Sequence, residues 1–224
     1  MSKLTFSEAE LKRLSPSDLK TLETIKAKLK ASNPNKDLLK GLKVVIDAGH
    51  GGKDSGAFNA VVKEKDLVLN QAKSLTSMLV SVGAEVFLTR GNDTFVELSQ
   101  RAKFANTKNA DLFISLHANR SQTRSDDSLG FESYVHDSLS KTGKTYKIGK
   151  AIHNAVHEKI KPFGIKDRGL KQANFAVLRE TKMPAILLEC GFLTSTKDTN
   201  AMTLDEFRTA YCTGILRGIK EALR

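Results

Sequence analysis

Residues 44–52 read VVIDAGHGG, and this stretch decides the fold of the chain. Its first three residues, Val44–Ile46, are β-branched and apolar, which favours a strand that is covered on both faces. Glycines surround His50 and let the backbone approach a ligand closely. Open α/β sheets place their chemistry at the carboxyl ends of central strands. The stretch therefore predicts a buried strand over 43–48, followed by a turn that presents Asp47 and His50.

Two other apolar runs carry residues of the same kind. LFISLHAN contains His117, and AILLECG contains Glu189. If these strands are parallel neighbours, we expect both residues beside His50 at one edge of the sheet, with Glu64 reaching in from the next helix. Two imidazoles and one carboxylate are the ligand set of a catalytic zinc, which keeps a fourth position for water. The remaining carboxylate can then move protons.

From Lys43 onward the pattern alternates between strands and helices. Strands are predicted at 43–48, 85–89, 112–118, 130–136, 175–179 and 185–190. Helices are predicted at 64–82, 95–106, 148–160 and 204–219. This alternation predicts an α/β fold, a single domain with a mostly parallel central sheet flanked by helices on both faces.

Residues 1–40 differ from the rest of the chain. Ser15 and Pro16 are typical of a helix start, and Pro34 is typical of a helix end. We interpret 1–40 as an N-terminal helical extension or linker, and 41–224 as the catalytic domain. The polar residues 120–128 predict a mobile loop beside the site.

Composition excludes several classes of protein. No apolar run approaches the ~20 residues of a membrane span, and the N-terminus lacks the apolar core of a signal peptide. The net charge of +11 is spread along the chain, and three Tyr with no Trp offer little base stacking. We therefore expect no nucleic-acid partner. The charge itself is compatible with plain solubility or with attraction to a polyanionic surface, such as anionic wall polymers or DNA, and does not choose between them. The two cysteines form no framework, and we interpret Cys190 as a buried thiol.

The motifs VVIDAGHGGKDSGA, EKDLVLN, LTR, SLHAN, GFESY and DRGLKQANFAVLRETKMPAILLECGFLT resemble the zinc-dependent N-acetylmuramoyl-L-alanine amidases of the amidase-3 family. The resemblance covers about 43–224, in order. It implies one Zn²⁺ per chain, held by His50, Glu64 and His117. It also implies that Glu189 is the catalytic acid/base. The implied reaction cleaves the amide bond between N-acetylmuramic acid and L-alanine of the peptidoglycan stem peptide.

Several further residues are candidates for contact with substrate or with the zinc ligands. Asp47 is predicted to orient His50, and the resemblance places Arg168 and Asn174 in a loop near the site. The remaining candidates are Arg90, Asn119 and Glu132. His136, His153 and His157 are interpreted as surface residues.

Three alternatives remain at these positions. Asp66 is the rival of Glu64 as a ligand and otherwise faces solvent. If Glu189 is not the acid/base, two alternatives remain for it. It is a buried partner of Arg90 or Arg179, or it is a fourth ligand in the resting enzyme.

The functional alternatives are another zinc hydrolase of cell-wall material, a peptidase or deacetylase, and a catalytically silent wall-binding module. We expect a monomer that acts at the bacterial cell wall. No signal peptide is visible, and this is compatible with three settings: a phage lysin, an enzyme released by a mother cell, or a trimmed secreted autolysin.

Overall fold

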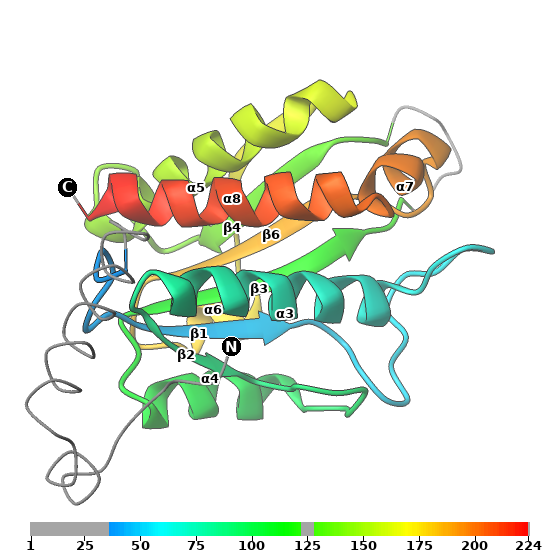
Figure 1. Ribbon diagram of the computed structural model, residues 1–224. Coiled ribbons are helices and arrows are strands. Elements are labelled where there is room, and N and C mark those ends of the chain that lie inside the picture. Colours follow the sequence, from blue (N-terminus) through cyan, green and yellow to red (C-terminus); the bar gives the residue numbers. More distant parts are fainter. Residues whose placement is uncertain (1–35, 122–127, 224) are drawn as a thin grey trace, which may run out of the picture. The chain divides into compact units, whose positions relative to one another are not determined.

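A computed structural model of the chain describes residues 36–121 and 128–223. The helix expected within 1–40 and most of the loop expected at 120–128 lie outside these residues. From Leu39 onward the chain forms one compact unit. It consists of a six-stranded sheet with helices on both faces, which confirms the predicted fold class (Figure 1).

The strands are β1 (Lys43–Ala48), β2 (Glu85–Leu88), β3 (Leu112–Asn119), β4 (Phe131–His136), β5 (Asp167–Ala173) and β6 (Ala185–Phe192). Their order in the sheet is β2-β1-β3-β6-β4-β5. Every neighbouring pair is parallel except β4 and β6. The three strands that carry the predicted site, β1, β3 and β6, are therefore adjacent and parallel, as the sequence predicts.

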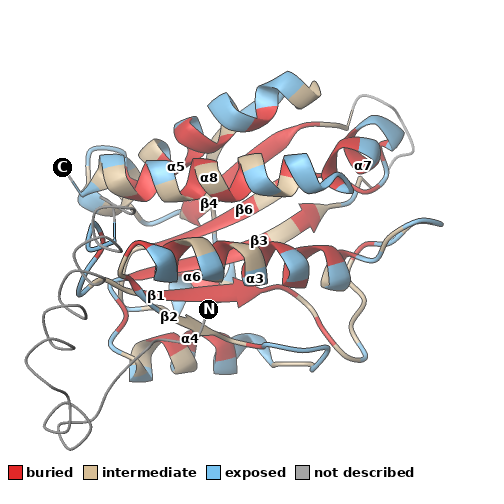
Figure 2. Cartoon of the chain, in the orientation of Figure 1, coloured by how far each residue is buried: buried red, intermediate tan, exposed pale blue. Residues whose placement is uncertain are grey.

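The helices are α3 (Glu64–Ser81), α4 (Leu98–Thr107), α5 (Lys144–Ile160), α6 (Ala176–Arg179), α7 (Thr196–Met202) and α8 (Asp205–Ala222), with a 3₁₀ turn η1 (Lys161–Phe163). One hydrophobic cluster joins α3, α5 and α8 to one face of the sheet, and a smaller cluster joins α4 and α6 to the other. The central strands of the sheet are buried between them, while the outer sides of the helices are exposed (Figure 2).

The strand predicted at 175–179 is wrong. Residues 176–179 form the short helix α6, and the strand of this region is β5, which precedes it and was not predicted. β5 is an edge strand, and among the described strands β4 is its only partner. Its polar sequence DRGLKQA therefore lacks the apolar run by which a buried strand is recognised.

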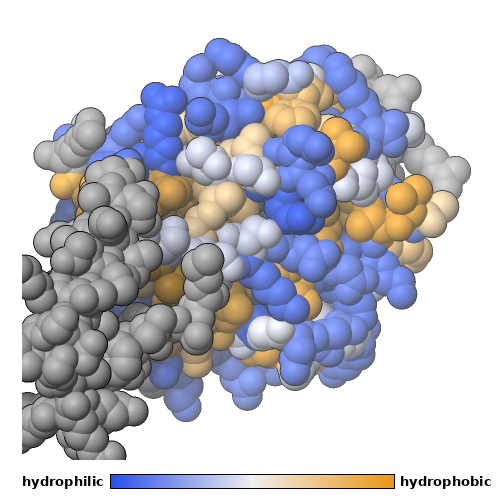
Figure 3. Space-filling view, in the orientation of Figure 1, coloured by the Kyte–Doolittle hydropathy of each residue, from blue (hydrophilic) through white to orange (hydrophobic). Residues whose placement is uncertain are grey.

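The surface seen in Figure 3 is mostly hydrophilic, with hydrophobic side chains in scattered groups. Among the described residues, no helix combines the length and apolar character that crossing a bilayer requires.

Candidate metal centre

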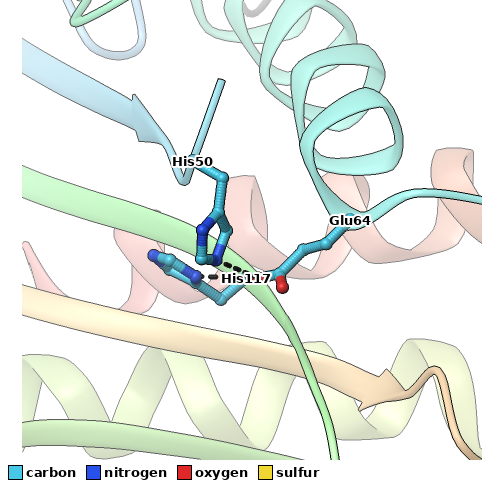
Figure 4. Close-up of side chains that lie close together, drawn as sticks. All are labelled: His50, Glu64 and His117. Atoms are coloured by element: carbon cyan, nitrogen blue, oxygen red, sulfur yellow. Dashed lines mark hydrogen bonds and ion pairs between the residues drawn. The ribbon is translucent and has the colours of Figure 1, made fainter. Parts of the chain in front are cut away.

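Three side chains from distant parts of the chain converge at the carboxyl edge of β1 and β3 (Figure 4). His50 lies on the turn after β1, Glu64 is the first residue of α3, and His117 lies near the end of β3. One possible ligand atom from each lies within 4.8 Å of the other two. His50 has a φ of 58°, an uncommon backbone conformation for a residue other than glycine and one that is often found at functional sites.

Glu64 is held rigidly between the two histidines. Its Oε1 lies 3.0 Å from Nε2 of His50 and 2.9 Å from Nδ1 of His117, and it accepts the backbone N–H of Ala118. Its Oε2 accepts the backbone N–H of Ala57 at 2.8 Å. The side chain is buried, so these four contacts fix the carboxylate before any ligand arrives.

The three groups shift one another's pKa. Burial alone would lower the pKa of His117, but the hydrogen bond and charge of Glu64 outweigh it and raise this pKa to about 9. Burial likewise opposes the raised pKa of His50, which Glu64 and Asp54 cause. Burial alone would raise the pKa of Glu64, yet hydrogen bonds from His117 and His50 hold it far below its usual range. The ionised form of Glu64 and the protonated forms of both histidines therefore stabilise one another.

The outer partner of His50 is Asp54, and the prediction of Asp47 in this role is wrong. Nδ1 of His50 donates to Oδ2 of Asp54 at 2.8 Å. Such a carboxylate orients a metal-binding imidazole and fixes which nitrogen faces the ion. Asp54 follows His50 by four residues on the same turn. This short spacing is the feature of the sequence from which the contact between Asp54 and His50 could have been predicted.

Asp47 belongs to a buried network that holds the turn. It accepts hydrogen bonds from Arg101, Thr89 and Ser115. Arg101 also donates to the carbonyls of Ala48 and His50, and the predicted site residue Arg90 donates to those of Ala48, Gly49 and Lys65. Two arginines thus position the histidine turn through its backbone carbonyls and through Asp47. Arg101 lies within a polar helix segment, and no feature of the sequence distinguishes it.

Gly49 makes room for the ring of His117. A Cβ at this position would lie 2.3–2.7 Å from three ring atoms of His117, closer than real contacts allow. We predict that Gly49→Ala displaces the imidazole and weakens the binding of a metal ion at this cluster by about ten- to a hundredfold, the range seen when ligand orientation is disturbed. Competition with a chelating dye measures this affinity. Gly91→Ala is the matched control, because a Cβ there meets nothing within 4 Å. Equal affinities for the two variants would contradict the prediction.

Glu189 lies next to the cluster on β6, directly opposite His117 in the register. Its Oε2 is buried and has no hydrogen-bond partner among the described residues. Burial raises its pKa to about 7, with the charges of Glu64 and Glu132 adding to the rise and that of His117 opposing it. The suggested partners are occupied elsewhere, since Arg90 binds backbone carbonyls and Arg179 binds Asn174 and Glu180. Glu189 is thus a carboxyl group that can exchange a proton near neutral pH.

The remaining predicted site residues divide into two groups. Asn119, Glu132 and Arg168 lie together beside Glu189, joined by hydrogen bonds, although Arg168 is on strand β5 rather than in a loop. Asn174 lies at the opposite end of the sheet. It directly follows Ala173, the last residue of β5, which pairs with His136 at the end of β4. Its predicted place near the site is therefore wrong. Lys171, which was not predicted, joins the first group through Glu132.

Some of the other interpretations are confirmed. Asp66 is exposed, and Cys190 is buried. His153 is fully buried, contrary to the prediction, because it lies on the side of α5 that packs against the sheet. Its ring is satisfied there by Ser133 on β4 and Asp167 on β5. His136 and His157 are partly exposed.

The fold and the site define an α/β protein with a cluster of two histidines and one glutamate that could hold a metal ion. The sequence matches the N-acetylmuramoyl-L-alanine amidase model of the amidase-3 type over residues 44–221. The chain therefore belongs to this family of N-acetylmuramoyl-L-alanine amidases, as the motifs predict.

Relatives and solved structures agree with this placement. The chain is 42% identical over 181 residues to the endolysin of Bacillus phage SPP1, covering 80% of this chain and 65% of the endolysin. It is 37% identical over 183 residues to a sporulation-specific N-acetylmuramoyl-L-alanine amidase of Bacillus subtilis, covering 81% of this chain and 68% of that amidase. The chain thus spans about two thirds of the length of these relatives.

Among solved structures, the amidase AmiC2 of Nostoc punctiforme is 38% identical with a TM-score of 0.74. The match covers 82% of this chain and 98% of that one. The catalytic domain of CwlV from Bacillus (Paenibacillus) polymyxa is 41% identical with a TM-score of 0.70, covering 81% and 98% of the two chains.

Proposed function

We propose that this protein is a zinc-dependent hydrolase that cleaves the amide bond between N-acetylmuramic acid and L-alanine in peptidoglycan. The observation that carries the proposal is the convergence of His50, Glu64 and His117 in a chain of this amidase family. Glu189 is its acid/base. The bacterial cell wall is then its place of action, and anionic wall polymers are further candidate partners of its basic surface.

The donor set fits zinc. Two imidazoles and a carboxylate supply three of four tetrahedral positions, which is the composition of catalytic rather than structural zinc sites. Asp54 supplies the outer hydrogen bond that such a histidine needs. When bound, zinc lowers the pKa of a water molecule and polarises the scissile carbonyl.

The residues of the chain supply the proton transfers. Glu189 removes a proton from the attacking water and passes it to the nitrogen of L-alanine, which leaves as an amine. Burial raises the pKa of Glu189 above that of an ordinary glutamate, which suits a carboxyl group that must both accept and return a proton. The unpartnered Oε2 of Glu189 provides the acceptor for this proton.

Zinc loading is expected to release protons. At pH 7 His117 is protonated on the nitrogen that faces Glu64, and Nε2 of His50 faces the same carboxylate. The metal must displace the proton of His117 and any proton on Nε2 of His50, whereas the Nδ1 proton of His50 stays on its bond to Asp54. We predict release of between one and two protons per zinc at pH 7, and tighter binding as the pH rises toward about 9, where the competing proton on His117 is lost. Calorimetry in two buffers with different ionisation enthalpies measures the number. Equal heats in both buffers would contradict the prediction.

The activity itself is tested on purified peptidoglycan. The proposal predicts new L-alanine amino termini that depend on zinc, without new reducing sugars. Newly exposed amino groups of other residues would indicate a peptidase, and released acetate a deacetylase. Zinc-loaded protein that binds the wall but releases nothing would indicate a silent binding module.

A further inference from the structure

A row of charged side chains crosses the sheet from the metal centre to its far edge. On neighbouring strands, His117 lies opposite Glu189, and Glu189 lies opposite Glu132. Directly opposite residues of paired strands point to the same face of a sheet. The row continues on the edge strand β5, where Arg168 and Lys171 both contact Oε2 of Glu132.

Glu132 is saturated and cannot serve as a second acid/base. Its Oε1 accepts from Tyr134 and from Asn119, each at 2.7 Å, and its Oε2 accepts from both cations. The side chain is only 3% exposed. Two cations around one carboxylate leave a net positive charge at this end of the row.

The cations keep donors to spare. Arg168 binds Glu132 through Nε, and its two terminal nitrogens have no hydrogen-bond partner in the described part of the chain. The guanidinium also lies 4.9 Å above the ring of Phe192, which holds it in place. The side chains of Arg168 and Lys171 are 33% and 38% exposed, so a ligand can reach both. A guanidinium with free N–H groups is suited to binding a carboxylate.

We propose that Arg168 and Lys171 form a subsite for a carboxylate of the substrate's stem peptide. This inference rests on the proposed function. Strands are about 4.8 Å apart, so β5 lies roughly 10 Å from Glu189's strand. An extended peptide covers about 3.3–3.6 Å per residue. The carboxylate therefore belongs to the second or third residue after the scissile amide, and the subsite selects peptides that carry it.

Matched substrates test this subsite on the zinc-loaded protein. The probes are two pairs of N-acetylmuramoyl tripeptides. Within each pair, one member carries a free carboxylate and the other carries a carboxamide in its place. The first pair has this change on the second peptide residue, and the second pair has it on the third. We expect a preference in kcat/KM of about tenfold or more for the carboxylate in one pair, the size of a charge-assisted hydrogen bond. The absence of a preference in both pairs would overturn the inference.

Two variants assign the preference to these residues. Lys171→Met removes one charge, and Arg168→Lys keeps the charge but removes the planar fork, so that Glu132 retains a partner in each. Either change is expected to reduce the carboxylate preference several-fold, while Lys182→Met, a change to an exposed lysine just before β6, leaves it intact. If Arg168 and Lys171 only neutralise Glu132, the Arg168→Lys and Lys171→Met proteins will lose the same activity on the carboxylate and on the carboxamide substrate. That result would contradict the subsite.

Binding separates this inference from the proposed function. The matched alanyl tripeptides without the sugar are titrated into the zinc-loaded protein, which needs no turnover. Tighter binding of the carboxylate form supports the subsite even if no amidase activity is found. Equal binding of both forms by a protein that does cleave peptidoglycan refutes the subsite and leaves the amidase intact.

Discussion

Replacing Glu189 by glutamine is expected to lower kcat by about 10²- to 10⁴-fold, the contribution typical of a general acid/base. Glutamine keeps the size and most of the polarity of the side chain, but it accepts no proton from water. The steady-state rate on soluble muramoyl peptides measures the loss. Since Glu189 is not among the three converging donors, zinc content should stay at that of the unchanged protein.

The matched control is Glu158→Gln, which removes an exposed carboxylate from α5. It should leave kcat unchanged. A Glu189→Gln protein with nearly full activity would exclude the acid/base role. A Glu189→Gln protein that has lost its zinc would instead indicate that this carboxylate is a fourth ligand.

His117→Ala is expected to abolish both zinc retention and activity. The variant keeps one histidine and one carboxylate, and it leaves the buried charge of Glu64 with a single histidine partner. Loss of a residue that only hydrogen-bonds a metal ligand lowers metal affinity by up to ~100-fold. Because His117 is itself a proposed ligand, we expect its loss to lower zinc affinity by more than this. Metal analysis after dialysis, together with the peptidoglycan assay, measures both effects.

His136→Ala serves as the control for this change, because His136 ends β4 at the other end of the sheet. It should retain both zinc and activity. Full activity in His117→Ala would show that hydrolysis does not depend on the cluster. Loss of zinc in both variants would point to a general effect on folding.

The convergence of His50, Glu64 and His117 was predictable because it follows from strand order. His50 and His117 each end an apolar run, and parallel neighbours bring such ends together. Glu64 required only that the next helix begin at the same edge. These predictions depend on regular elements, whose apolar patterns are strong.

The contacts around the ligands were less predictable because irregular backbone decides them. Asp47 continues the strand and faces Arg101, whereas the turn after it brings Asp54 to His50. The edge strand β5 has little apolar pattern, so Lys171 could not be placed beside Glu132. His153 was misplaced because α5 packs against both α8 and the sheet, which buries a wider stripe than the isoleucines alone indicate.

The central claim is that one zinc ion binds between His50, Glu64 and His117. Anomalous diffraction at the zinc absorption edge, from crystals of zinc-loaded protein, tests it most directly. The account predicts one strong peak within about 2.0–2.2 Å of a nitrogen of each histidine and an oxygen of Glu64. A peak bound by other residues, or no peak in protein that is active on peptidoglycan, would contradict it.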